Sequence, residues 1–375
     1  MSDYLCSQKT FLDLFSVSSV PLWFRHFMPI NRRKFLLQGA AVSAAALALP
    51  RWLRADEDDP EKSGGVLVTS KCHVAIEAGL AFLASRQQPD GAFGSGGYSR
   101  NVAVAGLCGL AFMSGGNTPG RGTYGREVDR TIRFILDNTE ESGFIVEPGA
   151  TSHGPMYGHG FATLFLGECY GMSQSRELRT KLVKAVKLIV NTQNREGGWR
   201  YHPQPSDADI SVTVCQIMAL RAARNAGIYV PNETIERCIE YVKQSQNADG
   251  GFRYMLQGGQ SQFPRSAAGV VALQSAGVYD SPEVKRGLKY LFDFLPRLGR
   301  IHESHYFYGH YYAVQAMWHA GGHLWSSWYP AVRDELLSLQ RPNGSWMDSI
   351  CQEYGTAMAC LVLQVPNNML PIFQR

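Results

Sequence analysis

A short phrase recurs four times in this chain: a glutamine is followed four positions later by a glycine and six positions later by an aromatic residue. The four copies are Gln87–Phe93, Gln193–Trp199, Gln246–Phe252 and Gln340–Trp346. Neighbouring copies are separated by about 50 residues or by twice that interval, and each lies between two stretches with helical spacing of apolar residues. Repeats of this length indicate stacked helical pairs, because one pair alone cannot bury its apolar face.

The residues of the phrase are expected to have structural rather than catalytic roles. The glycine supplies the positive φ angle that a turn at the end of a helix requires. The aromatic side chain can pack against the next pair, and the glutamine can satisfy backbone groups at the helix end. We therefore interpret each copy as a staple between pairs. The second and fifth pairs carry only degenerate copies, at Gly143-Phe144 and around Gly299.

Apolar spacing at i, i+3, i+4 and i+7 predicts six pairs of helices. The first helix of each pair has charged residues along one face, as at Lys181, Lys184 and Lys187, so that face meets water. These first helices are expected over residues 74–86, 126–138, 177–192, 232–245, 281–295 and 327–339. The second helices are apolar on nearly every face, which indicates burial. They are expected over residues 101–113, 159–170, 209–225, 265–276, 310–320 and 353–363.

Six amphipathic helices alternating with six apolar ones predict an all-α fold. We expect an α6/α6 toroid over residues 66–375, in which an inner barrel of six helices is wrapped by six more. An open superhelix of helical repeats is the competing architecture. Such a superhelix needs a polar terminal repeat, and the last predicted helix, 353–363, is too apolar for that role. A closed ring is therefore favoured.

The first 55 residues have the features of an export leader. Asn31–Lys34 is a twin-arginine pattern, and an apolar stretch of 14 residues, Leu36–Leu49, follows it. The stretch is short for a membrane span, so a signal that ends near Ala55 is favoured over an uncleaved anchor. Met28 stands at the distance before the arginines that is expected of a true start. We expect export through the twin-arginine pathway to the periplasm or the cell envelope, and a linker over residues 56–65.

The leader also accounts for the basic balance of the chain. The formal net charge is +4, but residues 1–55 contribute +5 from seven Lys or Arg and two Asp, so the remainder is near −1. Without a basic stripe, nucleic acid is not an expected partner. No Cys-x-x-Cys spacing occurs, and four cysteines fall in apolar helical runs, which favours buried free thiols over a zinc cluster. These cysteines are Cys108, Cys215, Cys351 and Cys360.

The repeated Gln-x-x-x-Gly-Gly-Trp/Phe phrase, set in helical pairs, resembles the repeat of squalene–hopene cyclases and of protein prenyltransferase β subunits. The resemblance covers about residues 70–363. It implies the α/α-toroid fold, but it does not fix the activity, because one fold supports many functions.

One polar residue stands near the predicted start of each second helix: Asn101, His159, Asp209, Arg265, His310 and Glu353. In a closed ring these starts meet at one mouth, above a cavity walled by Ala, Val and Met. A polar rim over an apolar cup suits a mostly apolar ligand with one polar end. Polar residues are also ordinary at helix starts, where they cap the helix. Both interpretations remain open.

The segment Ser206–Ile210 stands where class II terpene cyclases carry Asp-x-Asp-Asp, whose middle carboxylic acid protonates an alkene or epoxide. The resemblance implies that Asp209 is the catalytic acid and that Asp207 is its carboxyl partner. Paired carboxyls in an apolar site can hold one of them neutral. Ile210 occupies the fourth position of the motif, so one carboxylate of the pattern is missing.

The resemblance also implies a second comparison, with the zinc site of the prenyltransferase β subunit, which uses Asp-x-Cys and a later histidine. Asp207 and Asp209 take its first two positions and His310 the third, with a carboxylate in place of the thiolate. No cofactor is firmly implied, and a divalent metal is the alternative. The fifth pair is unusually rich in aromatic residues, which the cyclases use to stabilise carbocations. These residues are Tyr306, Tyr308, Tyr311, Tyr312 and Trp318.

The sequence therefore predicts a terpenoid cyclase/prenyltransferase-like toroid that binds an isoprenoid or another apolar lipid, with cyclase-like acid catalysis as the chemistry it would perform. The predicted substrate-binding residues are His159, Arg265, His310, Tyr311 and Glu353. The alternative is a non-catalytic exported toroid that binds a protein or a component of the cell envelope. Whether the chain is an enzyme stays open at this point.

Overall fold

The computed structural model describes residues 60–150, 154–173, 175–297 and 304–374, which belong to a unit that runs from Asp56 to Arg375. The predicted export leader, the linker up to residue 59 and the degenerate staple at Gly299 lie outside the described residues.

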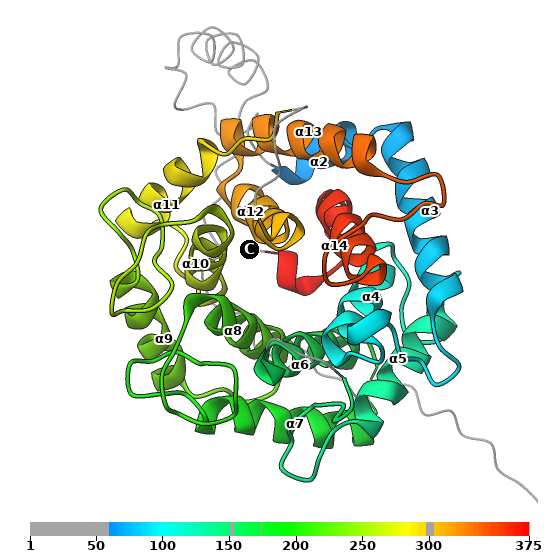
Figure 1. The fold of residues 1–375 in the computed structure, drawn as a ribbon, viewed down its shortest axis with the longest axis horizontal. Coiled ribbons are helices and arrows are strands. Elements are labelled where there is room, and N and C mark those ends of the chain that lie inside the picture. The colour runs from blue at the N-terminus through cyan, green and yellow to red at the C-terminus, as the bar shows by residue number, and fades with distance from the viewer. Residues whose placement is uncertain (1–59, 151–153, 174, 298–303, 375) are drawn as a thin grey trace, which may run out of the picture. The chain divides into compact units, whose positions relative to one another are not determined.

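In the described part of the chain, twelve helices form six pairs, each with an outer and an inner member (Figure 1). The outer helices are α3 (Ser70–Arg86), α5 (Gly125–Asp137), α7 (Arg176–Asn191), α9 (Asn232–Gln244), α11 (Pro282–Phe292) and α13 (Gly322–Leu339). The inner helices are α4 (Val102–Ser114), α6 (Pro155–Met172), α8 (Ile210–Asn225), α10 (Phe263–Ser275), α12 (Tyr306–Ala320) and α14 (Gln352–Gln364). A short helix, α2 (Pro60–Leu67), packs against α13.

The inner helices form a closed ring. Each one packs against the next, and α14 returns to pack against α4 (Figure 1). Small residues allow this close approach: a Cβ atom on Gly160 of α6 would lie 2.8 Å from Cβ of Cys215 on α8. The predicted α6/α6 toroid is confirmed, and the open superhelix is excluded.

The glutamines of the repeated phrase staple each pair to the next. The amide nitrogen Nε2 of Gln193 donates to Gly197 O of its own turn at 2.8 Å and to Thr234 O of α9 at 2.9 Å. Gln340 makes the same contacts with Gly344 O and with Ala75 O of α3, which joins the last pair to the first. The two glycines have positive φ angles and lie against the neighbouring outer helix, which leaves no room for a Cβ atom.

The second and fifth inner helices begin earlier than predicted. These begin at Pro155 and Tyr306, four residues before the expected starts at His159 and His310. Both histidines therefore lie a full turn inside their helices and not at the ends. The apolar-spacing signal missed these first turns because they contain partly exposed tyrosines, Tyr157 and Tyr308.

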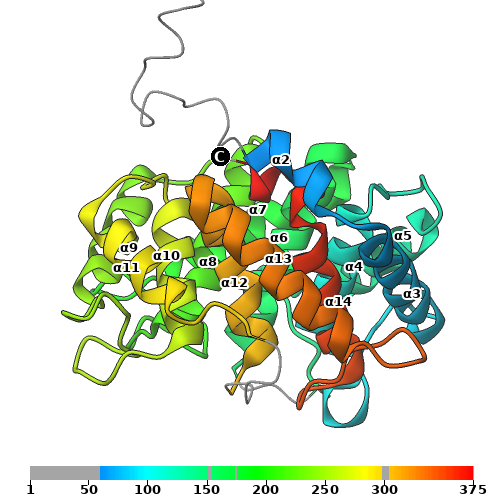
Figure 2. The same ribbon diagram turned by 90° about the horizontal axis from the view of Figure 1, so that it is seen from above.

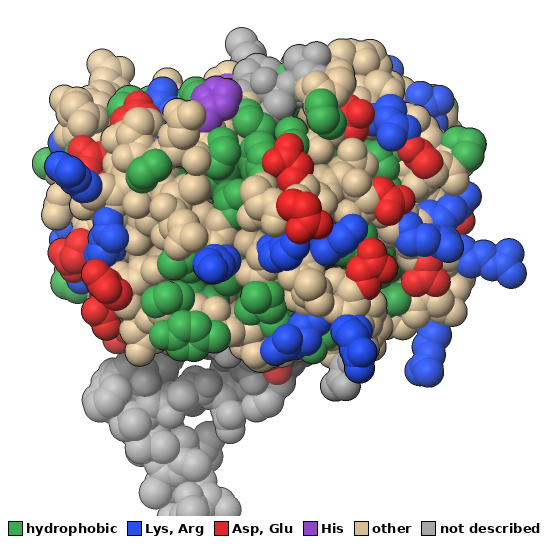
Figure 3. Space-filling view, turned by 90° about the horizontal axis from the view of Figure 1, so that it is seen from below, with side chains coloured by type: hydrophobic (Ala, Val, Ile, Leu, Met, Phe, Trp, Pro, Cys, Tyr) green, Lys and Arg blue, Asp and Glu red, His purple; other side chains and the backbone are tan. Residues whose placement is uncertain are grey.

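The outer wall is polar, as expected of amphipathic helices. On the α7 side, Lys and Arg are interspersed with Asp and Glu (Figure 3). Lys181 pairs with Glu177 on the same helix, and Lys184 pairs with Glu141 of the preceding loop. No helix in the described part of the chain is long and apolar enough to cross a membrane. The four cysteines of the inner helical runs are buried free thiols, as predicted.

The C-terminal segment closes one end of the ring. After α14, the chain forms two 3₁₀ turns, η3 (Val365–Asn367) and η4 (Pro371–Phe373), which contact α8, α12 and α14. We call residues 365–374 the strap. Trp318 of α12 donates to Phe373 O at 3.1 Å, and the side chain of Phe373 is fully buried. Figure 2 shows the C-terminus and α2 along one edge of the toroid.

Candidate functional site

The end of the ring opposite the strap is the mouth formed by the first turns of the inner helices. Hydrogen bonds join these starts: Met156 N of α6 donates to Tyr201 O, and Ile210 N of α8 donates to Tyr254 O. Apart from residues at their C-terminal ends, the inner helices are buried except in the first turn. The partly exposed first-turn residues are Ala103, Pro155, Tyr157, Ser211, Arg265, Tyr306, Tyr308 and Gln352.

Asp209 is the N-cap of α8 and lies at this mouth with no exposed surface. Its Oδ1 accepts hydrogen bonds from the backbone amides of Ser211 and Val212, both at 2.9 Å. A carboxylate suits this position because the first amides of a helix have no partner within the helix and carry partial positive charge.

The second oxygen of Asp209 faces a guanidinium. Arg200 Nε lies 3.3 Å from Asp209 Oδ2, while Arg200 Nη1 donates to Asp207 Oδ2 at 2.8 Å. The two predicted carboxyl partners are therefore joined through a cation. Asp207 is 45% exposed, in contrast to Asp209. The Arg200 guanidinium favours the ionised form of the buried Asp209 carboxyl.

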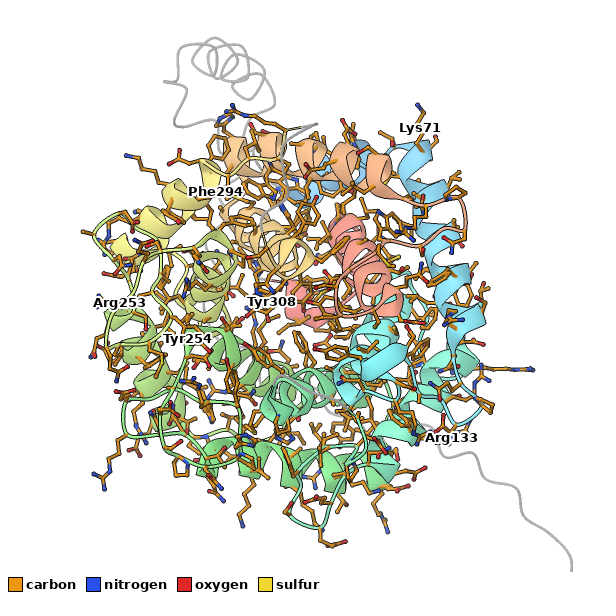
Figure 4. The ribbon with its side chains drawn as sticks, viewed as in Figure 1. Lys71, Arg133, Arg253, Tyr254, Phe294 and Tyr308 are labelled. Atoms are coloured by element: carbon orange, nitrogen blue, oxygen red, sulfur yellow. The ribbon has the colours of Figure 1, made fainter. Side chains whose placement is uncertain are left out.

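Two tyrosines complete the surroundings of Asp209. Tyr254 OH donates to Asp209 Oδ2 at 3.3 Å and also hydrogen-bonds Tyr201 OH. The Arg200 guanidinium stacks over both rings, with Cζ 4.7 Å from the Tyr201 centroid and 5.4 Å from that of Tyr254. Arg265 lies over Tyr254 as well, at 5.7 Å. Figure 4 shows Tyr254 beside α10, on the inner side of the outer wall.

Burial raises the pKa of Asp209 to about 6, against the opposing effects of the two backbone amides, Arg200 and Tyr254. Burial, and the nearby Asp209 carboxylate, likewise raise the pKa of Tyr157 well above its ordinary value. Asp209 is therefore ionised at neutral pH and accepts a proton near pH 6, within the range in which a carboxyl can act as acid or base.

Two of the predicted substrate-binding residues have structural partners. His159 is fully buried: its Nδ1 accepts from Ile145 N, its Nε2 lies 3.2 Å from Ala185 O, and burial lowers its pKa to about 4. Both ring nitrogens are thus occupied by backbone. His159 corresponds in position to Thr213 of the next repeat. There, the hydroxyl of Thr213 accepts a hydrogen bond from Trp199 N.

Glu353 lies at the start of α14, where it binds two groups. Arg86 Nε donates to its Oε1 at 2.9 Å, and Ser95 Oγ donates to its Oε2 at 2.8 Å. Burial opposes ionisation, but these hydrogen bonds outweigh it and hold the pKa of Glu353 below the usual range. Glu353 is therefore an ionised link between α14, α3 and the loop before α4.

The remaining predicted residues lie on α10 and α12. Arg265 is partly exposed at the mouth. His310 is buried among aromatic rings, with centroids 4.4 Å from Tyr306 and 5.0 Å from Phe263. Tyr311 is buried deeper in the ring and packs edge-on against Phe161 of α6 at 6.3 Å.

The structure does not assemble the proposed metal ligands. Within the described ranges, no group of three or more His, Cys, Asp or Glu side chains could hold a metal ion. Asp207 and Asp209 face Arg200, whereas His310 lies within the aromatic cluster between α12 and α13. A guanidinium beside both carboxylates disfavours a cation at the same place.

Sequence reasoning missed Arg200, Tyr201 and Tyr254. A signal for them was present, because the staples of the third and fourth pairs continue in parallel as Gly-Gly-Trp-Arg-Tyr and Gly-Gly-Phe-Arg-Tyr. The Arg-Tyr extension follows the staple aromatic directly, where the chain turns into the next inner helix. Its repetition at Arg200 and Arg253 marks these two loops as different from the others.

Two family models match this chain. The squalene-hopene cyclase C-terminal domain matches residues 162–332, and the prenyltransferase alpha-alpha toroid domain matches residues 66–184. Together with the closed ring of helical pairs, these matches support a squalene–hopene cyclase/prenyltransferase-like family for this chain.

Drimenyl diphosphate synthase from Streptomyces showdoensis is 24% identical over 182 residues, which make up 48% of this chain and 32% of that enzyme. The chain thus matches about a third of the length of this relative.

Among solved structures, the type II terpene cyclase MstE from Scytonema is similar, with a TM-score of 0.59 and 15% identity over 80% of this chain and 99% of that one. An inactive variant of an alpha-1,6-mannanase from Salegentibacter sp. is similar too, with a TM-score of 0.58 and 8% identity over 79% of this chain and 99% of that one. At these identities the likeness shows the fold alone, and the toroid serves unrelated chemistries.

Proposed function

We propose that this toroid binds an isoprenoid or another mostly apolar lipid at the mouth of its inner ring, with the polar end of the ligand near Arg265 and the Asp209–Arg200 pair. The observation that carries the proposal is the make-up of the mouth. Tyr157, Tyr308 and Ala103 offer apolar and aromatic surface beside a few charged groups, which is the form of a site for an apolar ligand with one polar end.

Relatives support this class of ligand. MstE was solved with geranylgeranyl dihydroxybenzoate as substrate and with merosterolic acid A as product. The name of the Streptomyces enzyme, drimenyl diphosphate synthase, points to a terpenoid diphosphate. An uncharged membrane lipid fits an exported protein better than a diphosphate, because prenyl diphosphates are made inside the cell.

Native mass spectrometry tests the binding proposal. The purified protein is incubated separately with geranylgeraniol, squalene and palmitic acid, and we expect retention of one or both isoprenoids in preference to the fatty acid. If neither isoprenoid is retained, the protein is instead the non-catalytic toroid that binds a protein or an envelope component. The fully bonded carboxylate of Asp209, which serves as a helix cap, is the observation that favours this second candidate.

We further propose Asp209 as the proton donor of a cyclase-like isomerisation. Its proton would pass to an alkene carbon of the ligand and leave a carbocation, while the carboxylate formed is already held by two amides and Arg200. Loss of a proton from the cation to water completes the reaction without a net change in composition. Asp207 takes part only through Arg200, as a positioning residue.

The variant Asp209→Asn tests the catalytic assignment, because asparagine still caps the helix but cannot donate this proton. We expect loss of cyclised product, measured by gas chromatography with mass spectrometry, with lipid binding retained. Asp207→Asn is the matched variant and should keep most of the turnover. Full turnover in Asp209→Asn together with a lowered melting temperature would show that Asp209 is only a cap.

Export through the twin-arginine pathway remains part of the proposal. It rests on Arg32 and Arg33, which lie outside the described residues. Replacing both arginines with lysine should retain the protein in the cytoplasm, as measured by cell fractionation with an antibody to the toroid. Unchanged localisation of this double variant would remove the export signal from the proposal.

A further inference from the structure

Tyrosines of α12 reach across the interior of the ring to α8. These two helices are not neighbours, because α10 lies between them and packs against both. Even so, Tyr308 OH donates to Ser211 O of α8 at 3.0 Å, and Tyr312 OH lies 3.4 Å from Cys215 Sγ of α8. Figure 4 shows Tyr308 inside the ring, toward its centre.

The two contacts follow one another by a helical turn on both helices. Tyr308 and Tyr312 are four residues apart on α12, as Ser211 and Cys215 are on α8. Residues at this spacing lie on one helix face, about one turn and about 6 Å apart along the axis. We call this double contact the tyrosine bar.

Exposure changes sharply along the bar. Tyr308 is partly exposed at the mouth, whereas Tyr312 has no exposed surface. Tyr311 fills the adjacent space by packing against Tyr312 at 4.8 Å and against Phe161 of α6. Solvent therefore reaches the interior only as far as the first rung of the bar.

Both contacts of the tyrosine bar are weak, so Tyr308 and Tyr312 can move away from α8 without disrupting the packing of the inner helices. The Tyr308 contact is one neutral hydrogen bond, and the contact to a thiol is weaker still. Burial raises the pKa of the Cys215 thiol to about 12, so it stays neutral and no ion pair holds this rung. The barrier to a deep ligand is thus mainly the volume of the Tyr312 ring.

We propose that the tyrosine bar sets how far an apolar chain enters the ring and so selects ligands by length. The inference rests on the proposed lipid binding at the mouth. A short isoprenoid chain is held above Tyr312, and a longer one must displace that ring from its contacts with Cys215 and Tyr311.

Competition between farnesol and geranylgeraniol, which differ by one isoprene unit, tests this inference. The protein is incubated with an equimolar mixture, and the two complexes are counted by native mass spectrometry. We expect the wild-type protein to favour farnesol and Tyr312→Ala to shift the ratio at least tenfold toward geranylgeraniol. Tyr312→Phe keeps the ring and should change the ratio less than threefold.

Tyr241→Ala is the matched control, because Tyr241 is a buried tyrosine of the outer helix α9. This variant removes the same side-chain volume as Tyr312→Ala, but at a site outside the interior of the ring. It should leave the ratio of the farnesol and geranylgeraniol complexes unchanged. Tyr312→Leu replaces Tyr312→Ala if the alanine variant does not fold, as judged by circular dichroism. If farnesol and geranylgeraniol bind with the wild-type ratio in Tyr312→Ala, or in the Tyr312→Leu variant that replaces it, selection by the tyrosine bar is overturned while lipid binding stands. Binding of neither alcohol by any variant overturns the proposed function itself.

Discussion

The two ends of the inner ring are built from the same six helices but differ in the side chains that line them. At the mouth, the helices begin with partly exposed tyrosines and with a buried carboxylate, Asp209, that caps free amides. At the other end, the strap covers the helix ends with buried apolar side chains, including Ile372 and Phe373. The comparison shows that the polar groups of the candidate site lie at the mouth, where the inner helices begin and their first backbone amides have no acceptor within the helix. The end covered by the strap contributes mainly apolar packing.

The strapped end holds a buried acidic residue, Glu168, whose setting is the reverse of that of Asp209. Glu168 of α6 is 2% exposed, and burial raises its pKa to about 8, opposed by a hydrogen bond from Ile372 of the strap and by Arg221 of α8. Its Oε2 has no hydrogen-bond partner. Asp209, with both oxygens engaged, is ionised at neutral pH, and Glu168 is mainly protonated there.

The strongest test of the contrast is to remove the strap's anchor. Phe373→Ala should lower the free energy of unfolding by about 3–5 kcal/mol, because it leaves a cavity where a fully buried ring stood. Urea unfolding monitored by circular dichroism measures this loss. Met369→Ala, at a side chain 52% exposed in the same strap, should change the free energy by less than about 0.5 kcal/mol. Equal small losses in both variants would mean that the strap does not close the ring.

The second test uses pH. Because the folded-state pKa of Glu168 is raised, the folded protein holds a proton that the unfolded chain has lost above pH 5, so stability falls as pH rises toward about 8. Between pH 6.5 and 8, the other two shifted groups contribute little to this slope. Asp209 is largely ionised in the folded protein, and His159 adds only a small trend in the opposite direction, as the unfolded chain loses the last of its histidine proton.

We expect a loss of about 2 kcal/mol over this interval for the wild-type protein, measured by urea unfolding at each pH, and almost none for Glu168→Gln. Glutamine keeps an acceptor for the strap amide and carries no charge. The same slope in both proteins would assign the pH dependence to another group.

The third test concerns the cap at the mouth. Asp209→Ala should lower the free energy of unfolding by about 1–2 kcal/mol, because the amides of Ser211 and Val212 lose their acceptor. Asp209→Asn should retain most of the stability, since asparagine caps equally well. Thermal melting of the two variants at pH 7.5 checks this order, and equal melting temperatures would show that the cap is not what the carboxylate contributes.

The smallest effect on stability is expected at Arg265. Its guanidinium has no carboxylate partner among the described residues and lies over the Tyr254 ring, so Arg265→Gln should change stability by less than about 0.5 kcal/mol. If the mouth binds the polar end of a ligand, the same variant should weaken binding of geranylgeranic acid by about tenfold, the loss of one charge-assisted hydrogen bond. Titration calorimetry measures this binding. Unchanged affinity would remove Arg265 from the site.

Much of the fold was predictable because it depends on short-range patterns. The staple phrase sets a turn, and the helical spacing of apolar residues sets which face is buried. The degenerate second copy forms the same kind of turn, since Gly143 has a positive φ angle and lies against Lys184 of α7. The strap was not predicted, because residues 365–374 have no periodic pattern and are buried only by helices far away in the sequence.

The candidate site was predictable only in part. Asp209 stands at the mouth, as the alignment of helix starts predicted, but His159 does not reach it, since its helix begins a turn earlier and its ring serves the backbone. The sequence does not fix how far an apolar helix is rotated about its axis, because nearly all of its faces are apolar. The side chain that meets the interior is therefore decided by packing with its neighbours.

The sequence by itself determined the number of helical pairs, their alternation of amphipathic and apolar members, and the staples that join them, because each of these follows from local spacing. Only the tertiary structure decided that Arg200 stands between Asp207 and Asp209, that Tyr312 bars the ring, and that the strap covers Glu168. These relations join residues from different repeats. They exist only once the ring has closed and brought the helix starts to one end and the helix ends to the other.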